Sequence, residues 1–158
     1  LRTLVSGAVK TSGAVAAVFA VDPRPAPLFV AALFVWLFFW ENGGQNVPND
    51  WTDIEEDRRF KAKNIPVRFG TARSNGIIFV SLGVAVGFSL ILFSLSQTPF
   101  GLPFAGLVLL VGGCLLLLPA YRLYRNPTRA GAMALFNRAS YYPMALLLVV
   151  LLKLITTA

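Results

Sequence analysis

Residues 77–95 read IIFVSLGVAVGFSLILFSL, a run of nineteen residues without a charged side chain. The hydrocarbon core of a bilayer is about 30 Å thick, and a helix needs roughly 20 apolar residues to cross it. The uninterrupted apolar length therefore predicts a transmembrane helix. Gly83 and Gly87, four residues apart within it, predict a face where another helix approaches closely.

Four other apolar runs accompany this one along the chain. The first ends in the proline-rich turn at 22–27, because proline stops a helix. The second has only about 13 apolar residues, so it should continue as a helix or dip beyond Glu41. The five expected spans are about 4–21, 28–40, 77–95, 104–120 and 141–155, with a tight hairpin at 98–103.

The overall composition indicates a membrane protein. Hydrophobic residues make up 56% of the 158 residues and charged residues 13%, and the mean hydropathy is +0.69. These values exclude a soluble globular domain. We expect an all-α fold, a polytopic transmembrane helix bundle of about five spans. It forms a single transmembrane domain over residues 1–158, with residues 41–75 as a cytoplasmic motif segment.

The charge distribution indicates how the chain is oriented. Lys and Arg number 14 against 7 for Asp and Glu, but the positive residues sit in short segments between apolar runs, which argues against nucleic-acid binding. Six of the positive residues lie in the segment 41–75, and four lie in an expected basic loop at 121–138 on the same face of the membrane. Only Arg24, and Lys153 by snorkelling, lie opposite, so both basic segments should be cytoplasmic.

Single residues exclude several kinds of chemistry. Cys114 is the one cysteine, so the chain can form no internal disulfide, and we interpret its thiol as buried packing. The sequence has no histidine, which excludes His-based metal sites and Ser-His-Asp or Cys-His arrangements. Residue 1 is Leu and an apolar stretch begins almost at once, so we expect a piece of a longer protein. Lys10 argues against reading that stretch as a signal peptide.

Residues 41–75 are the segment where chemistry is expected, because they hold six of the seven acidic residues. Asn46, Asn49, Asp53 and Asp57 are spaced by 3, 4 and 4 residues, and on a helix these offsets align the side chains along one stripe. Two carboxylates one turn apart repel each other. A divalent cation at the membrane face would relieve that repulsion.

The available ligands favour Mg²⁺ for this cation. Carboxylate and amide oxygens are hard ligands, and an EF-hand is excluded because Arg58 stands where that loop needs glycine. Magnesium completes its coordination with water and phosphate oxygens, so the acids together with the basic residues suggest a diphosphate. These basic residues are Arg58, Arg59, Lys61, Lys63 and Arg68. A solvated connector with local ion pairs is the alternative, which we favour for Glu55 and Glu56; Asp50 fits either interpretation.

The segment resembles the second aspartate-rich motif of the UbiA-type intramembrane prenyltransferases, D-x-x-Y-x-x-x-D-x-x-x-D. Asn46 stands at the leading Asp of that motif, Asn49 at its Tyr, and Asp53 and Asp57 at its trailing aspartates. The stretches around 63–70 and 136–143 also look like the family. The resemblance covers essentially the whole chain, as the carboxy-terminal five helices of a UbiA-type nine-helix fold.

This resemblance implies Mg²⁺-dependent transfer of a polyprenyl group from a prenyl diphosphate to an aromatic or related acceptor within the membrane. It implies that Asp53 and Asp57 are catalytic and bind magnesium together with Asn49. Substrate binding would fall to Asn46, Asn49, Arg58, Lys63 and Arg68. It further implies an integral protein of a bacterial or archaeal cell membrane, in contact with membrane lipid and with no nucleic-acid partner.

The chain departs from the family pattern in two ways. The first aspartate-rich motif, which holds another magnesium ion, is absent from residues 1–158, so we expect the chain alone to be inactive. Asn46 and Asn49 carry less charge than the motif does and lack its phenol. Lys10 is a further candidate, expected either to face a polar cavity or to snorkel towards the cytoplasmic face.

Two hypotheses from other classes stay open at this point. The chain could belong to a membrane transporter whose acidic loop binds ions, which predicts flux across vesicles without diphosphate release. It could also be a structural membrane subunit with a solvated loop. In that case neutralising Asp53 and Asp57 would leave function and magnesium binding unchanged.

Overall fold

The computed structural model describes residues 2–96 and 100–157, and every regular element in these ranges is helical, which confirms the all-α expectation. Two of the elements, η1 and η2, are π-helical turns inserted between α-helices. In chain order the elements are α1 (Arg2–Val21), α2 (Pro27–Trp40), η1 (Glu41–Asn46), α3 (Val47–Thr52), α4 (Ile54–Arg59), α5 (Ile65–Ser94), α6 (Gly101–Gly112), η2 (Gly113–Leu117), α7 (Leu118–Arg125), α8 (Arg129–Ser140) and α9 (Tyr142–Thr157).

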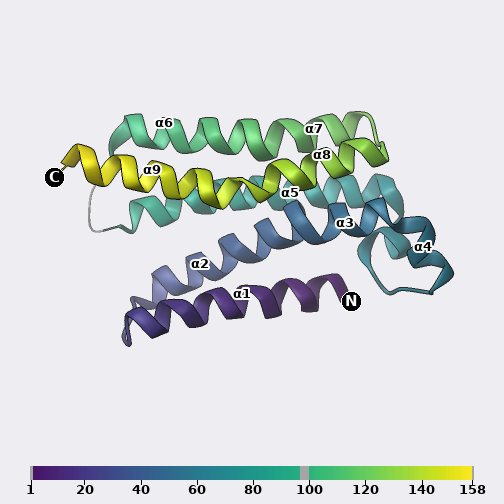
Figure 1. The fold of residues 1–158 in the computed structure, drawn as a ribbon, viewed down its shortest axis with the longest axis horizontal. Coiled ribbons are helices and arrows are strands. Elements are labelled where there is room, and N and C mark those ends of the chain that lie inside the picture. The colour runs from purple at the N-terminus through teal and green to yellow at the C-terminus, as the bar shows by residue number, and fades with distance from the viewer. Residues whose placement is uncertain (1, 97–99, 158) are drawn as a thin grey trace.

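Successive elements join into long helical segments, here called rods, that lie side by side along one direction (Figure 1). Five of them are long and apolar enough to cross a membrane, which confirms the expected number of spans. The second rod continues through η1 and α3, so its helix does extend beyond Glu41. The rods are Arg2–Val21, Pro27–Thr52, Ile65–Ser94, Gly101–Arg125 and Arg129–Thr156.

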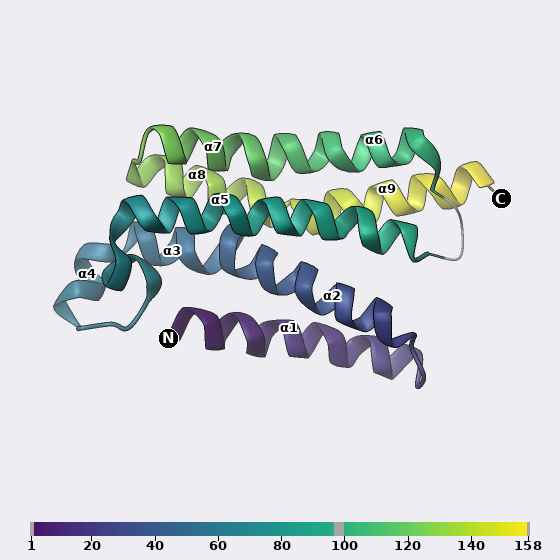
Figure 2. The same cartoon turned by 180° about the vertical axis from the view of Figure 1, so that it is seen from behind.

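The two ends of the bundle differ in character. One end carries the start of α1, the helices α3 and α4, the start of α5 and the α7–α8 connection, and we call it the polar end (Figures 1 and 2). The opposite end carries the α1–α2 connection and the end of α9. The basic residues of 58–73 and of 122–138 belong to elements at the polar end. The motif segment and the second basic segment therefore share one side of the bundle.

Glycines let η1 pack closely against its neighbours. A Cβ on Gly43 would lie 2.7 Å from the Cβ of Ser81 on α5, and one on Gly44 would lie 2.9 Å from the Cβ of Ala139 on α8. Real Cβ atoms do not approach so closely, so both positions need glycine. Beside them Trp40 Nε1 donates a hydrogen bond of 2.9 Å to the backbone oxygen of Ala139. These contacts fix the helix that leads into the motif.

Three expectations are wrong, two about packing and one about where helices begin and end. Gly83 and Gly87 face open space among the described residues, and Cys114 is exposed, because an apolar helix does not reveal which of its faces meets a neighbour. The expected basic loop at 121–138 is mostly helical, since only 126–128 lie outside α7 and α8. Arginine is a good helix former, so a cluster of arginines need not end a helix.

The helix α5 begins at Ile65, well before the apolar run at 77–95. Its first turn is set off by a kink at Gly70, where φ is 78° and ψ is 168°. This conformation is essentially restricted to glycine, so Gly70 permits the change of direction at the polar end. Residues 98 and 99 of the expected hairpin lie outside the described residues, and α6 begins within that hairpin at Gly101.

Candidate functional site

The motif segment does not form one continuous helix. The π-helical turn η1 ends at Asn46, α3 follows, and the backbone breaks at Asp53, where φ is −105° and ψ is 13°. Backbone hydrogen bonds still join Asn49 to Asp53 and Asp53 to Asp57, so these residues stay about one turn apart. The break and the wider turn of η1 nevertheless divide the predicted stripe between different sides of the segment.

One group of motif residues faces α1. A pocket of about 230 Å³, here called the α1–α3 pocket, is lined by side chains that are all polar. Asp50 is buried in its wall, where its carboxylate accepts hydrogen bonds of 2.8 Å from Arg2 Nη2 and 2.8 Å from Thr3 Oγ1. The lining residues are Arg2, Thr3, Ser6, Asn46, Asn49 and Asp50. Asn46 and Asn49 are therefore brought together with Asp50.

Asp57 lies near this pocket through the same arginine. Its carboxylate Oδ2 is 3.6 Å from Arg2 Nη2 and accepts a hydrogen bond of 2.5 Å from Asn64 Nδ2. The backbone N–H of Arg2 also donates to the carbonyl oxygen of Lys63 at 3.1 Å. Arg2 thus ties the start of α1 to both Asp50 and Asp57, and its charge offsets the repulsion between these two carboxylates.

Asp53 faces a different pocket. This second pocket, here called the α4–α8 pocket, has a volume of about 660 Å³ and is lined by α3, α4, Thr71 and the start of α8. Thr52 Oγ1 donates to Asp53 Oδ1 at 3.1 Å, and Arg129 Nη2 lies 4.0 Å from the same oxygen. The Asp53 side chain is 45% exposed, against 16% for Asp57. The two predicted catalytic carboxylates therefore do not share a pocket here.

The three predicted substrate-binding cations of the segment, Arg58, Lys63 and Arg68, lie at the polar end but outside both pockets, whereas Arg59 lines the α4–α8 pocket. Arg58 pairs with Glu55 at 3.3 Å in an exposed i,i+3 contact, and the Glu55 side chain is 79% exposed. The guanidinium of Arg68 lies 5.5 Å from the ring centre of Phe69. Lys63 is exposed, and its carbonyl oxygen accepts the bond from Arg2. The contact of Glu55 is the kind that a solvated connector makes.

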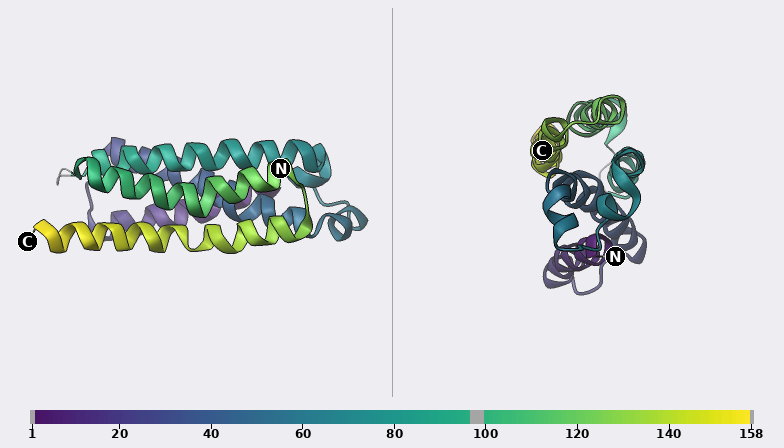
Figure 3. Two further views of the ribbon diagram at one scale, coloured as in Figure 1. Left: turned by 90° about the horizontal axis from the view of Figure 1, so that it is seen from above. Right: turned by 90° about the vertical axis from the view of Figure 1, so that its right-hand side faces the viewer.

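The side chain of Lys10 contacts the motif segment. Its ammonium Nζ forms an ion pair with Glu41 and lies 3.1 Å from Asn46 Oδ1. Glu41 and Asn46 are the first and last residues of η1. Figure 3 shows α1 at the margin of the bundle when it is viewed along its length. Lys10 therefore links this outer helix to the start of the motif.

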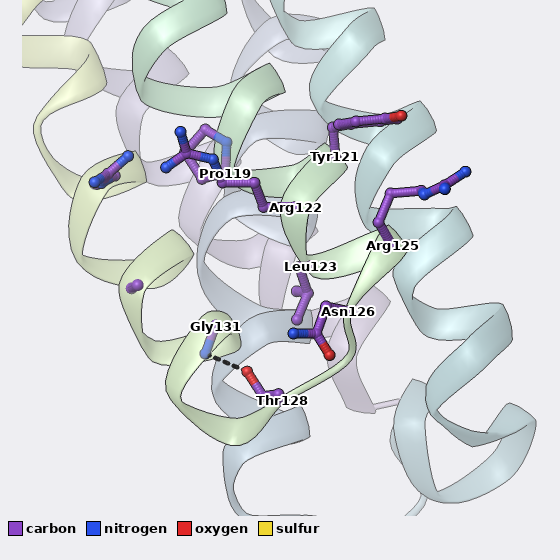
Figure 4. Close-up of a pocket in the computed structure, with 10 residues that line it drawn as sticks. Pro119, Tyr121, Arg122, Leu123, Arg125, Asn126, Thr128 and Gly131 are labelled. Carbon is purple, nitrogen blue, oxygen red and sulfur yellow. Dashed lines mark hydrogen bonds between the residues drawn. The ribbon is translucent and has the colours of Figure 1, made fainter.

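A third pocket, of about 440 Å³, lies between α7 and α8. Figure 4 shows Arg122 between these two helices, whereas Tyr121 and Arg125 extend away from α8. The described residues that line the pocket include several arginines and no acid, and the arginines are exposed. Among its described residues this pocket has no carboxylate that could bind a metal. Its arginines add positive charge to the polar end.

The donors at the polar end suit Mg²⁺. Within residues 2–96 and 100–157, no group of three or more carboxylate, thiol or imidazole side chains is close enough to hold a metal. Magnesium, however, is commonly bound by one or two carboxylates and completes its coordination with water and substrate phosphates. The carboxylates of Asp50, Asp53 and Asp57 and the amide oxygen of Asn49 are oxygen ligands of this kind. They fit an ion that is held together with a phosphate-bearing substrate.

Fold and site define a membrane-embedded helix bundle with a polar, amide-lined pocket at one end. The sequence model of the UbiA prenyltransferase family matches residues 1–152, and the chain belongs to this family. It is a membrane prenyltransferase at the level of its family, whose members generally use Mg²⁺. No curated protein and no solved structure matches the chain.

The structure adds residues that sequence reasoning did not single out. Arg2 and Thr3 contact the motif, although Arg2 stands 48 positions before Asp50 and no spacing rule links them. Glu41 contacts Lys10, which is 31 positions away. For Glu41 the available signal was Lys10 inside the first apolar run, because a charged residue within a span is normally paired.

Proposed function

We propose that this protein uses Mg²⁺ to transfer a polyprenyl group from a prenyl diphosphate to an aromatic or related acceptor inside the membrane. The observation that supports this most is the α1–α3 pocket, where amide, carboxylate and guanidinium groups converge at the end of an apolar bundle. A prenyl diphosphate has the same two-part character. Its apolar tail would lie along the helices, and its polyanionic head would occupy the polar end.

In this proposal, donors at the polar end bind the diphosphate. Arg2 carries a planar fork of N–H groups that matches phosphate oxygens, and Asn46 and Asn49 add amide groups beside it. Arg58, Lys63 and Arg68 are proposed to contact the outer phosphate from the exposed surface of the same end. These three residues line neither pocket of the motif segment. The observation that supports their role is the positive charge that they add to the polar end.

The carboxylates are proposed to hold the metal. Asp53 and Asp57 remain one turn apart on the backbone, with Asn49 one turn earlier, and Asp50 joins them as the carboxylate inside the α1–α3 pocket. Arg2 neutralises Asp50 and Asp57 in this structure. On substrate binding we expect Arg2 to turn towards the phosphate, which frees these carboxylates. Bound magnesium supplies further positive charge for the leaving group.

The reaction breaks the bond between C1 of the prenyl group and the bridging oxygen of the diphosphate. The departing diphosphate takes the electron pair, and the guanidinium and amide donors stabilise the charge that develops on it. The allylic cation that remains is attacked by the electron-rich carbon of an aromatic acceptor or by the hydroxyl oxygen of a glycerol lipid. The acceptor then loses a proton to the departed diphosphate or to water. The protein's contribution is electrostatic and positional, with no general acid required.

The proposal is tested with membranes that contain the protein expressed from its complete gene. Labelled prenyl diphosphates of several lengths are supplied with hydroxybenzoate, dihydroxynaphthoate or a glycerol lipid, and prenylated product and released diphosphate are measured. We expect equal amounts of both with Mg²⁺ and neither with EDTA. Asp50→Asn should lower the rate, whereas Asp22→Asn, in the turn at the opposite end, should not.

The same assay separates the proposal from its rivals. A transporter would move ions across sealed vesicles and release no diphosphate. A structural subunit would release none either, and its properties would not change in the Asp50→Asn variant. Failure to form product with every donor and acceptor pair, in membranes where the protein is present and folded, would overturn the proposed function.

A further inference from the structure

A buried polar group of the motif is left without a partner. The amide nitrogen Nδ2 of Asn46 is buried and has no hydrogen-bond partner among the described residues. Buried N–H groups are nearly always hydrogen-bonded, so an exception calls for an explanation. Asn46 also lines the α1–α3 pocket. An acceptor bound in the pocket would lie against Asn46, and it would satisfy this donor once the surrounding side chains move enough to expose Nδ2.

Lys10 determines which end of the Asn46 amide is free. The ammonium of Lys10 has donors and no acceptor, so it can contact only the amide oxygen, which lies 3.1 Å from Nζ. The amide nitrogen must then point elsewhere. An N–H group cannot ligate a cation but can donate to an anionic oxygen. The orientation of the side chain therefore favours phosphate over magnesium as its ligand.

Glu41 holds Lys10 in this position. Lys10 is eight residues into α1, which places it about 12 Å along the helix from Arg2. An unpaired ammonium at that depth in a membrane is costly, and Glu41, which is 8% exposed, provides the opposite charge. The π-helical turn makes the contact possible. Its i→i+5 repeat brings Glu41 and Asn46 to the same side, whereas an α-helix would point them apart.

We propose that Lys10 and Glu41 are positioning residues that fix Asn46 with its amide nitrogen as a hydrogen-bond donor to a phosphate oxygen of the prenyl diphosphate. The proposal rests on the proposed function and assigns separate binding roles to Asn46 and to the carboxylates. Asn46 binds the leaving group, while the carboxylates bind the metal. Lys10 and Glu41 do not touch the substrate; they act through Asn46.

One competing explanation lies on the same helix. The amide oxygen of Asn42 is also buried without a partner, and Asn42 stands four residues before Asn46. A bond between these two amides would satisfy both and would withdraw Asn46 from the substrate. In that case Asn42→Ala and Asn46→Ala would have equal effects on substrate binding. The proposal instead requires Asn46→Ala to have much the larger effect.

The test measures KM for the prenyl diphosphate, kcat and the Mg²⁺ concentration for half-maximal rate. Asn46→Ala should raise KM roughly tenfold or more, as expected for a lost bond to a charged group, and should leave the Mg²⁺ requirement unchanged. The paired change Lys10→Met with Glu41→Gln leaves no charge unpaired in the span. It should raise KM by a similar factor, and adding Asn46→Ala to it should raise KM little further.

Lys153→Met is the matched control. Lys153 also lies within a span, with its ammonium over the Phe104 ring at 5.2 Å, and is far along the chain from the motif. It should leave KM unchanged. If the Lys10 and Glu41 pair only holds α1 in place, the paired change would lower the melting temperature and keep KM, which overturns the inference. A change in the Mg²⁺ requirement of Asn46→Ala would overturn it as well.

The outcome also distinguishes this inference from the proposed function. Binding of magnesium pyrophosphate to the purified wild-type protein is followed by its shift in melting temperature. No shift together with no product formation removes the proposed function and this inference with it. A shift and normal activity in wild type, with an unchanged KM in Asn46→Ala, removes only the inference.

Discussion

The guanidinium of Arg2 lies 2.8 Å from the carboxylate of Asp50, across 48 positions of the sequence. This ion pair joins the first turn of α1 to the centre of the motif segment. The Asp50 side chain is 9% exposed and that of Arg2 58%, so a largely buried acid is neutralised by a base at the surface. Both residues of the pair line the α1–α3 pocket, so the pocket wall carries one positive and one negative charge.

Arg2→Met should therefore destabilise the protein. A buried acid that loses its partner costs several kcal/mol, but the exposure of Arg2 lowers the expected loss to about 1–2 kcal/mol. The melting temperature of the purified protein in detergent measures this. Arg24→Met, in the turn at the opposite end, is the control and should change little. Equal melting temperatures for the two variants would mean that the Arg2 contact contributes no stability.

Gly43→Ala and Gly44→Ala should each disturb the packing of η1. The added methyl groups would lie 2.7 Å from the Ser81 side chain and 2.9 Å from that of Ala139, and overpacking of this kind costs about 1–3 kcal/mol. Gly83→Ala and Gly87→Ala place the same methyl group in open space and should be neutral or slightly stabilising. Thermal unfolding of the four variants in one detergent would show the difference. A destabilised Gly83→Ala would contradict the packing described here.

The hydroxyls of Ser89 and Tyr142 share a buried hydrogen bond of 2.6 Å that joins α5 to α9. Ser89 donates to the carbonyl oxygen of Ala85, so the Tyr142 hydroxyl is the donor in this pair. Tyr142→Phe should cost about 1 kcal/mol, since single hydrogen bonds between membrane helices contribute about 0.6–2 kcal/mol. A double-mutant cycle with Ser89→Ala would measure the coupling. Tyr121→Phe, at an exposed position, serves as the control, and a coupling energy of zero would exclude the bond.

Asp53→Ala should reduce prenyl transfer far more than it reduces stability. Its side chain is 45% exposed and its ion pair with Arg129 is long at 4.0 Å, so removal should change the free energy of unfolding by less than about 1 kcal/mol. Loss of an electrostatic contact to the transition state should slow turnover by about 10²–10³. The rate with saturating Mg²⁺ is compared with that of Glu55→Ala, which should be near wild type. Wild-type turnover by Asp53→Ala would remove its catalytic assignment.

Much of the fold could be predicted because membrane spans depend on local composition. The apolar runs around 28–40 and 77–95 are sufficient to define helices whatever they pack against. The prediction of helix packing failed, because the face that packs is determined by the neighbouring helix. Gly83 and Gly87 have the spacing of a packing face but meet open space, whereas Gly43 and Gly44 are the close contacts. Nothing in an apolar helix marks which side faces lipid.

The arrangement of the candidate site also could not be predicted from residue spacing alone. The spacing of Asn46, Asn49, Asp53 and Asp57 predicts one stripe, but that prediction assumes a regular helix. The π-helical turn and the break at Asp53 rotate its members, so Asn46 and Asn49 meet Asp50 while Asp53 faces Arg129.

The order of residue types along the chain is enough to predict an all-helical membrane bundle with six of its seven acids in one polar segment, because both properties depend on which residues are neighbours in the sequence. The neutralisation of Asp50 and Asp57 by Arg2, and the contacts of Lys10 with Glu41 and Asn46, could be found only in the folded protein. These contacts depend on how α1 lies against η1 and α3. Helix packing, rather than any local spacing, brings together charges that are tens of residues apart.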